Sequence, residues 1–284
     1  MSEQSFILGA ENNLIATLTP AEPTDTTAPR LVAVLTNAGV IPRSGPHRMN
    51  VHLARRFAKM GIPSVRFDLS GVGDSRRSGG ALPIMQQWVV DTRAAMDKAQ
   101  SSFGCDRFFM VGFCSGAEVA HLVALEDARM RAAVLWDLYA YPTLEFKLRR
   151  VMYRLHRAGA QGVVRKLLNL CVRALSRSPV DAGNGPAEVS QVPPRDEVAR
   201  RFQTLVGDGV ELLVAYSGGQ NEWFNHREQF QVMFAGCPFV NEVAFEFLQI
   251  SDHVITRREA QLAFTNMVVR WLEDRVLPAI QPAR

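Results

Sequence analysis

The sequence of 284 residues predicts an α/β fold, with a mostly parallel sheet covered by helices on both faces. Two observations predict it. Short apolar runs with the length of buried strands alternate with longer stretches of helical periodicity along most of the chain. A glycine-rich turn, Gly112-Phe-Cys-Ser-Gly116, joins one of these runs directly to a helical stretch. Such alternation is typical of parallel sheets, because each parallel pair of strands needs a crossover connection.

The expected elements follow one another in this order. The first two strands, residues 5–9 and 14–18, flank the polar segment Glu11-Asn-Asn13 and are expected to form a hairpin. Further strands are expected at residues 31–36, 62–67, 107–111, 132–136, 210–216 and 242–248. Helices are expected between or after them at residues 47–60, 84–99, 115–125 and 256–276.

The alternation is interrupted after the sixth strand. Residues 140–178 have a helical, amphipathic and basic pattern, and residues 178–194 resemble a loop. We interpret residues 138–195 as a helical lid inserted into a single domain that comprises residues 1–284. Between Glu145 and Arg177 the chain has nine basic residues and one acidic residue. This segment therefore has a net charge of +8, whereas the whole chain has +4, which indicates a docking surface.

Composition limits the class of protein. The charged fraction of 21% and hydrophobic fraction of 47% are ordinary for a globular protein, and no apolar run approaches the length of a membrane-spanning helix. The first residues lack the basic and apolar regions of a signal peptide. The four cysteines have neither paired nor metal-ligand spacing. These features predict a cytoplasmic protein with reduced thiols, without a metal or another cofactor and without a nucleic-acid partner.

The turn at residues 112–116 has the pattern G-x-C-x-G. Between a strand and a helix, the related pattern G-x-S-x-G forms a tight turn that presents a nucleophile, and its flanking glycines avoid a steric clash. Cys114 is therefore the expected nucleophile. Ser115 is the alternative, but its neighbours would then be Phe113 and Ala117, and a phenylalanine does not fit a position that tolerates almost no side chain.

With this turn, the segments from Gly45 to Ser75 and Leu213-Val-Ala-Tyr-Ser-Gly218 make the chain resemble the α/β-hydrolase superfamily in its serine-aminopeptidase-like branch. The segment from Gly45 to Ser75 resembles most the hydrolases associated with exosortase and exopolysaccharide gene clusters. The resemblance implies the α/β-hydrolase fold for nearly the whole chain. It also implies an oxyanion hole built from the backbone N–H of Ser115 and that of Gly39 or Val40, which follow the third strand.

The superfamily orders its triad as nucleophile, acid and histidine. His253 lies between the last expected strand and the last expected helix, where the superfamily has its base. Two acids are candidates. Glu222 has the spacing of the usual G-x-x-D motif after the seventh strand, if the motif begins at Gly219. Asp137 directly follows the sixth strand and resembles the acid of synthase thioesterase domains, and Asn221 is a third possible partner for His253.

A cysteine in this position favours acyl transfer through a thioester intermediate, which amines and thiols accept readily. Dienelactone hydrolases, polyhydroxyalkanoate synthases and some cyclising thioesterases have a turn with a cysteine nucleophile that resembles this one. We therefore expect a thioesterase or acyltransferase for a group bound to an acyl carrier protein or coenzyme A. Arg149, Arg150 and Arg154 of the basic segment are expected to dock that anionic carrier. A free-standing esterase or lactone hydrolase and a non-catalytic binding module are the alternatives.

Overall fold

Strands that alternate with helices along the chain assemble into one sheet. The computed structural model describes residues 3–23, 31–156, 192–218 and 223–280. Its eight-stranded sheet has the order β1-β2-β4-β3-β5-β6-β7-β8. The strands are β1 (Gln4–Leu8), β2 (Leu14–Thr19), β3 (Val32–Leu35), β4 (Ser64–Phe67), β5 (Phe108–Phe113), β6 (Met130–Trp136), β7 (Glu211–Ser217) and β8 (Ala244–Leu248). The expected strands are all present, with ends shifted by a few residues.

The sheet is mixed at one edge and parallel elsewhere. β1 and β2 form the expected antiparallel hairpin, in which Leu8 pairs with Leu14, and β2 is also antiparallel to β4. The remaining pairs, from β4 through β3 and β5 to β8, are parallel. The central strands β3, β5 and β6 are buried almost throughout, which explains their continuous apolar sequence.

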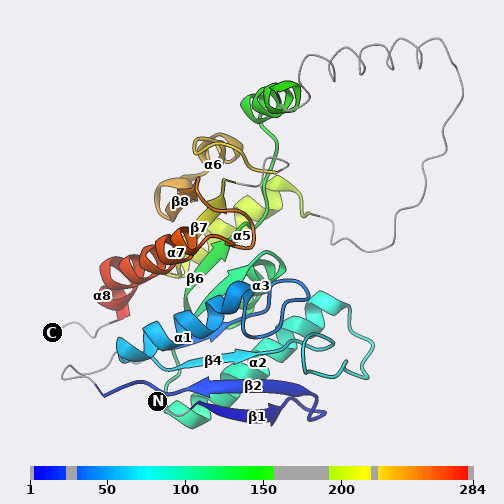
Figure 1. The fold of residues 1–284 in the computed structure, drawn as a ribbon, viewed down its shortest axis with the longest axis vertical. Helices are drawn as coiled ribbons and strands as arrows, with labels where there is room; N and C mark the ends of the chain where they lie inside the picture. The colour runs from blue at the N-terminus through cyan, green and yellow to red at the C-terminus, as the bar shows by residue number, and fades with distance from the viewer. Residues whose placement is uncertain (1–2, 24–30, 157–191, 219–222, 281–284) are drawn as a thin grey trace, which may run out of the picture.

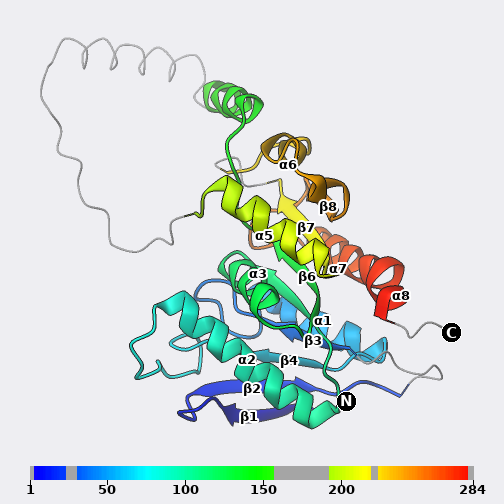
Figure 2. The same ribbon diagram turned by 180° about the vertical axis from the view of Figure 1, so that it is seen from behind.

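Helices cover both faces of the sheet (Figures 1 and 2). One face carries α1 (Met49–Lys59), α7 (Arg258–Trp271), the π-helical turn Leu272–Val276 and α8 (Leu277–Ile280). The other carries α2 (Ile84–Phe103), α3 (Ser115–Glu126) and α5 (Arg195–Gly207). The short helix α6 (Gln229–Met233) and two 3-10 turns, Pro46–Arg48 and Pro238–Asn241, are also present. Neither α5 nor α6 is among the helices expected from the sequence.

Residues 144–156 are helical, as expected for the start of the inserted segment, and residues 157–191 lie outside the described residues. The lid as a whole therefore stays a proposal. In the described ranges, no helix combines the length and the apolar character that crossing a bilayer requires.

Candidate functional site

The turn after β5 holds Cys114 in a strained conformation. Its backbone angles are φ 54° and ψ −119°, which an L-amino acid rarely adopts. A Cβ atom on Gly112 would lie 2.3 Å from the carbonyl oxygen of Gly116, and one on Gly116 would lie 2.1 Å from that of Asn37. Both glycines are therefore required by close backbone approach. The expected turn is present, and it presents Cys114 at the carboxyl end of β5.

His253 and Asp137 form a hydrogen-bonded pair beside this turn. Nδ1 of His253 lies 2.8 Å from Oδ2 of Asp137, whose side chain is only 4% exposed. Asp137 also accepts hydrogen bonds from the backbone N–H (2.7 Å) and the hydroxyl (2.8 Å) of Ser217. The carboxylate is thus fixed from three directions. Glu222 and Asn221, the other candidates for this role, lie outside the described residues.

The end of β6 ties the site together through Trp136. Its backbone carbonyl accepts the N–H of Cys114 at 2.9 Å, and its indole Nε1 donates to the carbonyl of His253 at 3.0 Å. The indole is fully buried between the sheet and α7, where it packs edge-on against Phe264. One buried side chain therefore holds the loop of His253 near the turn of Cys114.

The surroundings of His253 favour its protonated form. The hydrogen bond to Asp137 and then the interaction with Cys114 outweigh partial burial and raise the pKa of His253 to about 10. Because Nδ1 is bound to Asp137, Nε2 is the ring nitrogen left to interact with Cys114. At neutral pH the imidazolium of His253 therefore lies beside Cys114, and the thiolate is the reactive form of a cysteine.

The backbone N–H groups expected to form an oxyanion hole are in different environments. Ser115 begins α3, so its backbone N–H has no acceptor within the helix and can bind an anion. The N–H of Gly39, however, donates to the hydroxyl oxygen of Ser115 at 2.8 Å. In this structure Gly39 therefore binds Ser115 rather than facing a vacant site. The side chain of Val40 is 88% exposed.

Asp68 has a structural role. It is completely buried and accepts hydrogen bonds from the side chains of Asn37 and Arg43 at 3.2 and 2.5 Å. Arg43 also pairs with Asp74 at 2.7 Å. Asn37 completes the link by accepting the backbone N–H of Leu69. This network joins the loops that follow β3 and β4 beneath the Cys114 turn.

A cavity of about 370 Å³ opens above Cys114 and His253. Its walls are mainly apolar and aromatic, and the lining includes Tyr139, Tyr216, Trp223 and Phe224. The hydroxyl of Tyr216 donates to the carbonyl of Tyr139 at 2.6 Å, and the ring of Tyr216 stacks on Phe224 at 4.0 Å. Sequence reasoning missed these aromatic residues, because nothing in a single sequence marks which aromatic side chains converge on one cavity.

One acidic side chain outside the Asp137–His253 pair also lines the cavity. Glu118 lies one helical turn after Cys114 on α3, on the same side of the helix. Burial and then the nearby charge of Glu118 raise the pKa of Tyr139 well above its usual value, so its phenol stays protonated.

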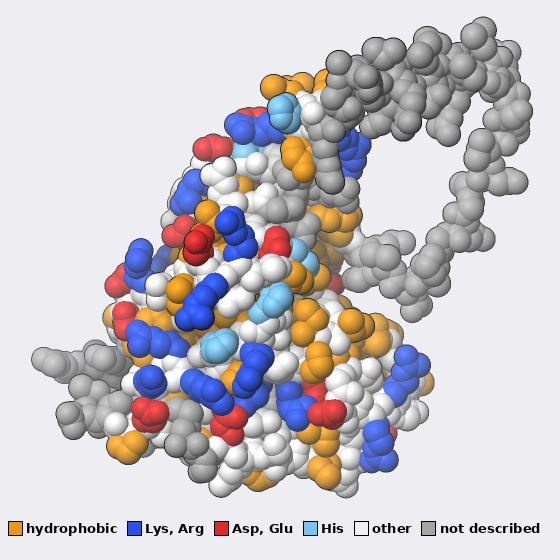
Figure 3. All heavy atoms as spheres, in the orientation of Figure 1, with side chains coloured by type: hydrophobic (Ala, Val, Ile, Leu, Met, Phe, Trp, Pro, Cys, Tyr) orange, Lys and Arg blue, Asp and Glu red, His pale blue; other side chains and the backbone are white. Residues whose placement is uncertain are grey.

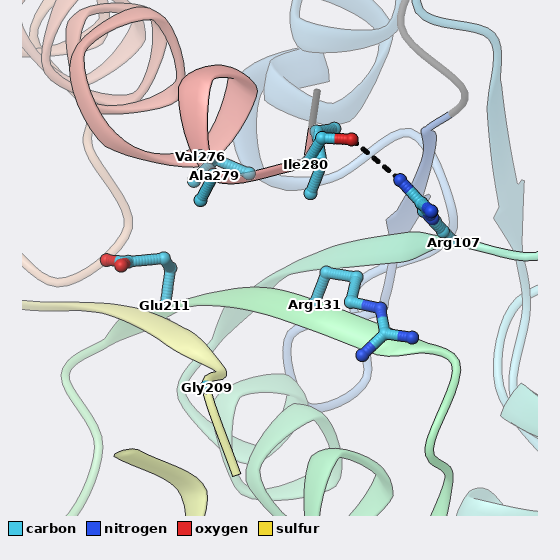
Figure 4. A pocket seen from close by; sticks show the side chains of 7 residues that line it. All are labelled: Arg107, Arg131, Gly209, Glu211, Val276, Ala279 and Ile280. Atoms are coloured by element: carbon cyan, nitrogen blue, oxygen red, sulfur yellow. Dashed lines mark hydrogen bonds between the residues drawn. The ribbon is translucent and has the colours of Figure 1, made fainter. Parts of the chain in front are cut away.

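A separate cavity of about 250 Å³ lies at the opposite ends of the central strands (Figure 4). Arg107, Arg131 and Glu211 line it near the amino ends of β5, β6 and β7. Arg107 donates to the carbonyl of Ile280 at 2.6 Å. Cys114, Asp137 and Ser217 follow or end these same strands at their carboxyl ends, so the two cavities are distinct.

The three arginines expected to dock a carrier are in different environments. Arg149 pairs with Glu145 at 2.6 Å, and the guanidinium of Arg150 lies over the ring of Phe146 at 5.9 Å. Arg154 is exposed and forms no ion pair with the described residues. The same helical segment, residues 144–156, exposes several large apolar side chains: Leu144, Leu148, Val151, Met152, Tyr153 and Leu155.

Comparison with known families connects this geometry to hydrolases. Residues 45–185, a segment that includes Cys114 and Asp137, match a family model described as serine aminopeptidase, S33. No curated protein matches the chain. The match over the nucleophile turn bears out the expectation of a hydrolytic enzyme, and leaves the identity of the nucleophile open.

Solved structures with the same fold span almost the whole chain. A proline iminopeptidase from Mycobacterium smegmatis aligns with 98% of this chain and 100% of its own at 15% identity, with a TM-score of 0.61. An esterase from Pyrococcus furiosus aligns with 96% and 91% at 14% identity and a TM-score of 0.60. A serine hydrolase without lid from Xanthomonas campestris aligns with 95% of both chains at 15% identity and a TM-score of 0.56. The chain therefore has the α/β-hydrolase fold.

Proposed function

We propose that this protein is a cysteine-dependent thioesterase or acyltransferase that takes an acyl group from an acyl carrier protein or coenzyme A. The observation that carries the proposal is the arrangement of three side chains in one cavity. Cys114 sits on the strained turn, His253 interacts with it, and the buried carboxylate of Asp137 orients the imidazole. A thiol in the position where related enzymes have a hydroxyl suits acyl groups that are exchanged between thiols.

The reaction needs only groups that line the cavity. The Cys114 thiolate attacks the carbonyl carbon, and the backbone N–H of Ser115, at the start of α3, binds the developing oxyanion. The carbon–sulfur bond to the carrier thiol breaks, and Nε2 of His253 gives its proton to the leaving thiolate. Water or another acceptor then loses a proton to His253 and attacks the Cys114 thioester, which releases the acyl product and restores the thiolate.

Two features support a carrier-bound substrate. The cavity of about 370 Å³ has a mainly apolar lining, which suits an acyl chain of modest length. Within the segment inserted after β6, residues 145–177 have a net charge of +8, and both acyl carrier proteins and coenzyme A are anionic.

The test is the intact mass of the protein after incubation with acyl-pantetheine, acyl-coenzyme A and acyl carrier protein. The wild-type protein should gain the mass of one acyl group, and hydroxylamine should remove it as expected for a thioester. Cys114→Ala should abolish the gain. Cys237→Ala is the matched control, because Cys237 is also a free, partly exposed thiol but does not line the cavity. Loading that survives in Cys114→Ala would refute the proposal.

A small-molecule esterase is the second candidate, favoured by the accessible cavity, which can accept a short ester without any carrier. The two functions differ in the acyl donor. An esterase should turn over p-nitrophenyl butyrate with a kcat/KM at least as high as that for the butyryl thioester of pantetheine. A thioesterase or acyltransferase should prefer the thioester and should respond further to the carrier.

A further inference from the structure

A second basic surface, separate from the inserted segment, lies beside the candidate active site. We define the basic face by six exposed residues of the 3-10 turn, α1 and the start of α7: His47, Arg48, His52, Arg56, Arg257 and Arg258. Basic and histidine side chains gather over this part of the molecule (Figure 3). In α1 itself, Met49–Lys59, there is no acidic residue.

The arginines of the basic face lack partners within the protein. In the described part of the chain, Arg48, Arg56, Arg257 and Arg258 form no ion pair within 4 Å, although many other arginines do. Arg55, on the same helix, pairs with Glu3 at 3.5 Å, and Arg275, further along this side, pairs with Glu211 at 2.9 Å. These four arginines are thus unpaired on one side of the molecule, although Glu259 adjoins Arg258 in α7 and Asp252 interacts with His47, and their positive charge can attract an anionic partner.

This face adjoins the loop of His253. The sulfur of Met49 in α1 lies 3.8 Å from the hydroxyl of Thr265 in α7, which brings the two helices together. Asp252, next to His253, accepts the N–H of Thr256 at 2.7 Å. Burial alone would raise the pKa of Asp252. This hydrogen bond and the charge of His47 outweigh burial and hold the pKa of Asp252 below its usual range. A partner on the basic face would therefore lie next to the catalytic loop.

The backbone holds two of these side chains at an energetic cost. His47 has φ 47° and Arg48 has φ 62°, so two successive residues with side chains adopt left-handed conformations. Each costs about 1–3 kcal/mol, and such outliers concentrate where a function requires them. A helix could start here without this strain, which suggests that the position of the two exposed side chains matters.

We propose that the basic face is the docking surface for an acidic carrier protein that delivers its acyl group to Cys114. This inference rests on the proposed function and adds the partner and its binding surface. The exposed positions of α1 are His52, Arg55, Arg56 and Lys59, all polar. A membrane-binding helix would place apolar side chains among its basic ones, and α1 exposes none. The composition of the face therefore fits an acidic protein surface better than a lipid surface.

The experiment compares two double charge reversals in the full-length protein. Arg56→Glu with Arg258→Glu alters the basic face. Arg131→Glu with Arg200→Glu is the matched control, because these arginines are also exposed and form no ion pair with described residues, but lie elsewhere. Each double variant has the same net charge. The substrates are a butyryl-loaded acidic acyl carrier protein, butyryl-coenzyme A and neutral butyryl-pantetheine.

The expected result is a rise in KM of about tenfold for the carrier in the basic-face variant only, with kcat retained. The wild-type KM for the carrier should rise with salt, and this dependence should weaken in that variant. Turnover of butyryl-pantetheine should stay unchanged in both variants, which shows that the catalytic groups are intact.

Three outcomes would overturn the inference. The first is an equal KM for the carrier in both variants. The second is a loss on butyryl-coenzyme A as large as that on the carrier, which would assign the face to phosphate groups. The third is an unchanged carrier KM together with lost sedimentation on phosphatidylglycerol vesicles, which would assign the face to a membrane. Failure of the wild-type protein to process any of the three thioesters would instead refute the proposed function.

Discussion

The carboxylate of Asp137 lies 2.8 Å from Nδ1 of His253, and both groups face the cavity that contains Cys114. Asp137 directly follows β6, whereas the superfamily resemblance placed the usual acid after β7. The backbone at Asp137 is itself unusual, with φ 51°. The residue leaves the strand in a left-handed conformation, and two hydrogen bonds from Ser217 on the neighbouring β7 hold its carboxylate.

This contact predicts that Asp137→Asn is far more damaging than Glu222→Gln. An amide in place of the carboxylate can favour the wrong ring tautomer and removes the charge that stabilises the imidazolium, so kcat should fall by about 100-fold or more. The measurement is kcat and KM for a butyryl thioester in both variants. A larger loss in Glu222→Gln would return the role to the residue after β7.

The raised pKa of His253 predicts a pH dependence of stability. The folded protein keeps the ring proton up to about pH 10, whereas an unfolded histidine loses it near the usual value of 6.5. The stabilisation from this group is therefore fully present below about pH 6.5 and is lost as the pH rises through about 10. Urea unfolding of the wild type and His253→Gln should show a difference that shrinks over this window. A difference that grows with pH would contradict the protonated pair.

The tight turn at residues 112–116 predicts that alanine at Gly116 destabilises the fold. A Cβ atom there would lie 2.1 Å from the carbonyl oxygen of Asn37, so Gly116→Ala must displace backbone and should cost about 3 kcal/mol. Acyl loading of Cys114 should fall as well. Gly207→Ala is the control, because a Cβ there meets nothing within 4 Å and alanine favours the helix by up to about 1 kcal/mol. Equal unfolding midpoints for the two variants would argue against the tight turn.

Much of this site could be predicted from the sequence. The contacts that could not be predicted join segments that lie far apart in the sequence. The Gly112–Cys114–Gly116 pattern is local, and local sterics dictate it, so the turn is as expected. His253 contacts an acid that lies 116 residues away in the sequence. Sequence spacing alone could not decide whether Asp137 or Glu222 is this acid. The bond between Gly39 and Ser115 depends on how the β3 loop meets α3, which no single segment encodes.

The inserted segment yields a prediction for its arginines. Arg149 is already paired with Glu145 and Arg150 packs on Phe146, so of these three arginines Arg154 should contribute most to the attraction of an anionic carrier. Arg154→Glu should raise KM for the butyryl-loaded carrier nearly as much as reversal of all three arginines. Added salt should mimic the change, because exposed charges are screened over about 8–10 Å at physiological ionic strength. Unchanged KM values in both variants would leave this segment without a docking role.

Ser115 provides a prediction that separates the two candidate nucleophiles. Its hydroxyl oxygen accepts the N–H of Gly39 at 2.8 Å, and its own backbone N–H begins α3. Ser115→Ala removes the hydroxyl and one neutral hydrogen bond worth about 1 kcal/mol, but leaves the backbone donor in place. The variant should therefore unfold slightly more easily and still load an acyl group on Cys114.

The Ser115→Ala variant also tests the role of Gly39, because it removes the acceptor of the Gly39 N–H. Once Ser115 no longer accepts the Gly39 N–H, that group is free to bind an oxyanion, so kcat should be retained or rise if Gly39 belongs to the oxyanion hole. Cys114→Ala is the comparison, since it should abolish acyl loading while the bond between Gly39 and Ser115 remains. The two readouts are intact mass and kcat on butyryl-pantetheine. Loss of loading in Ser115→Ala, with loading kept in Cys114→Ala, would make the serine the nucleophile.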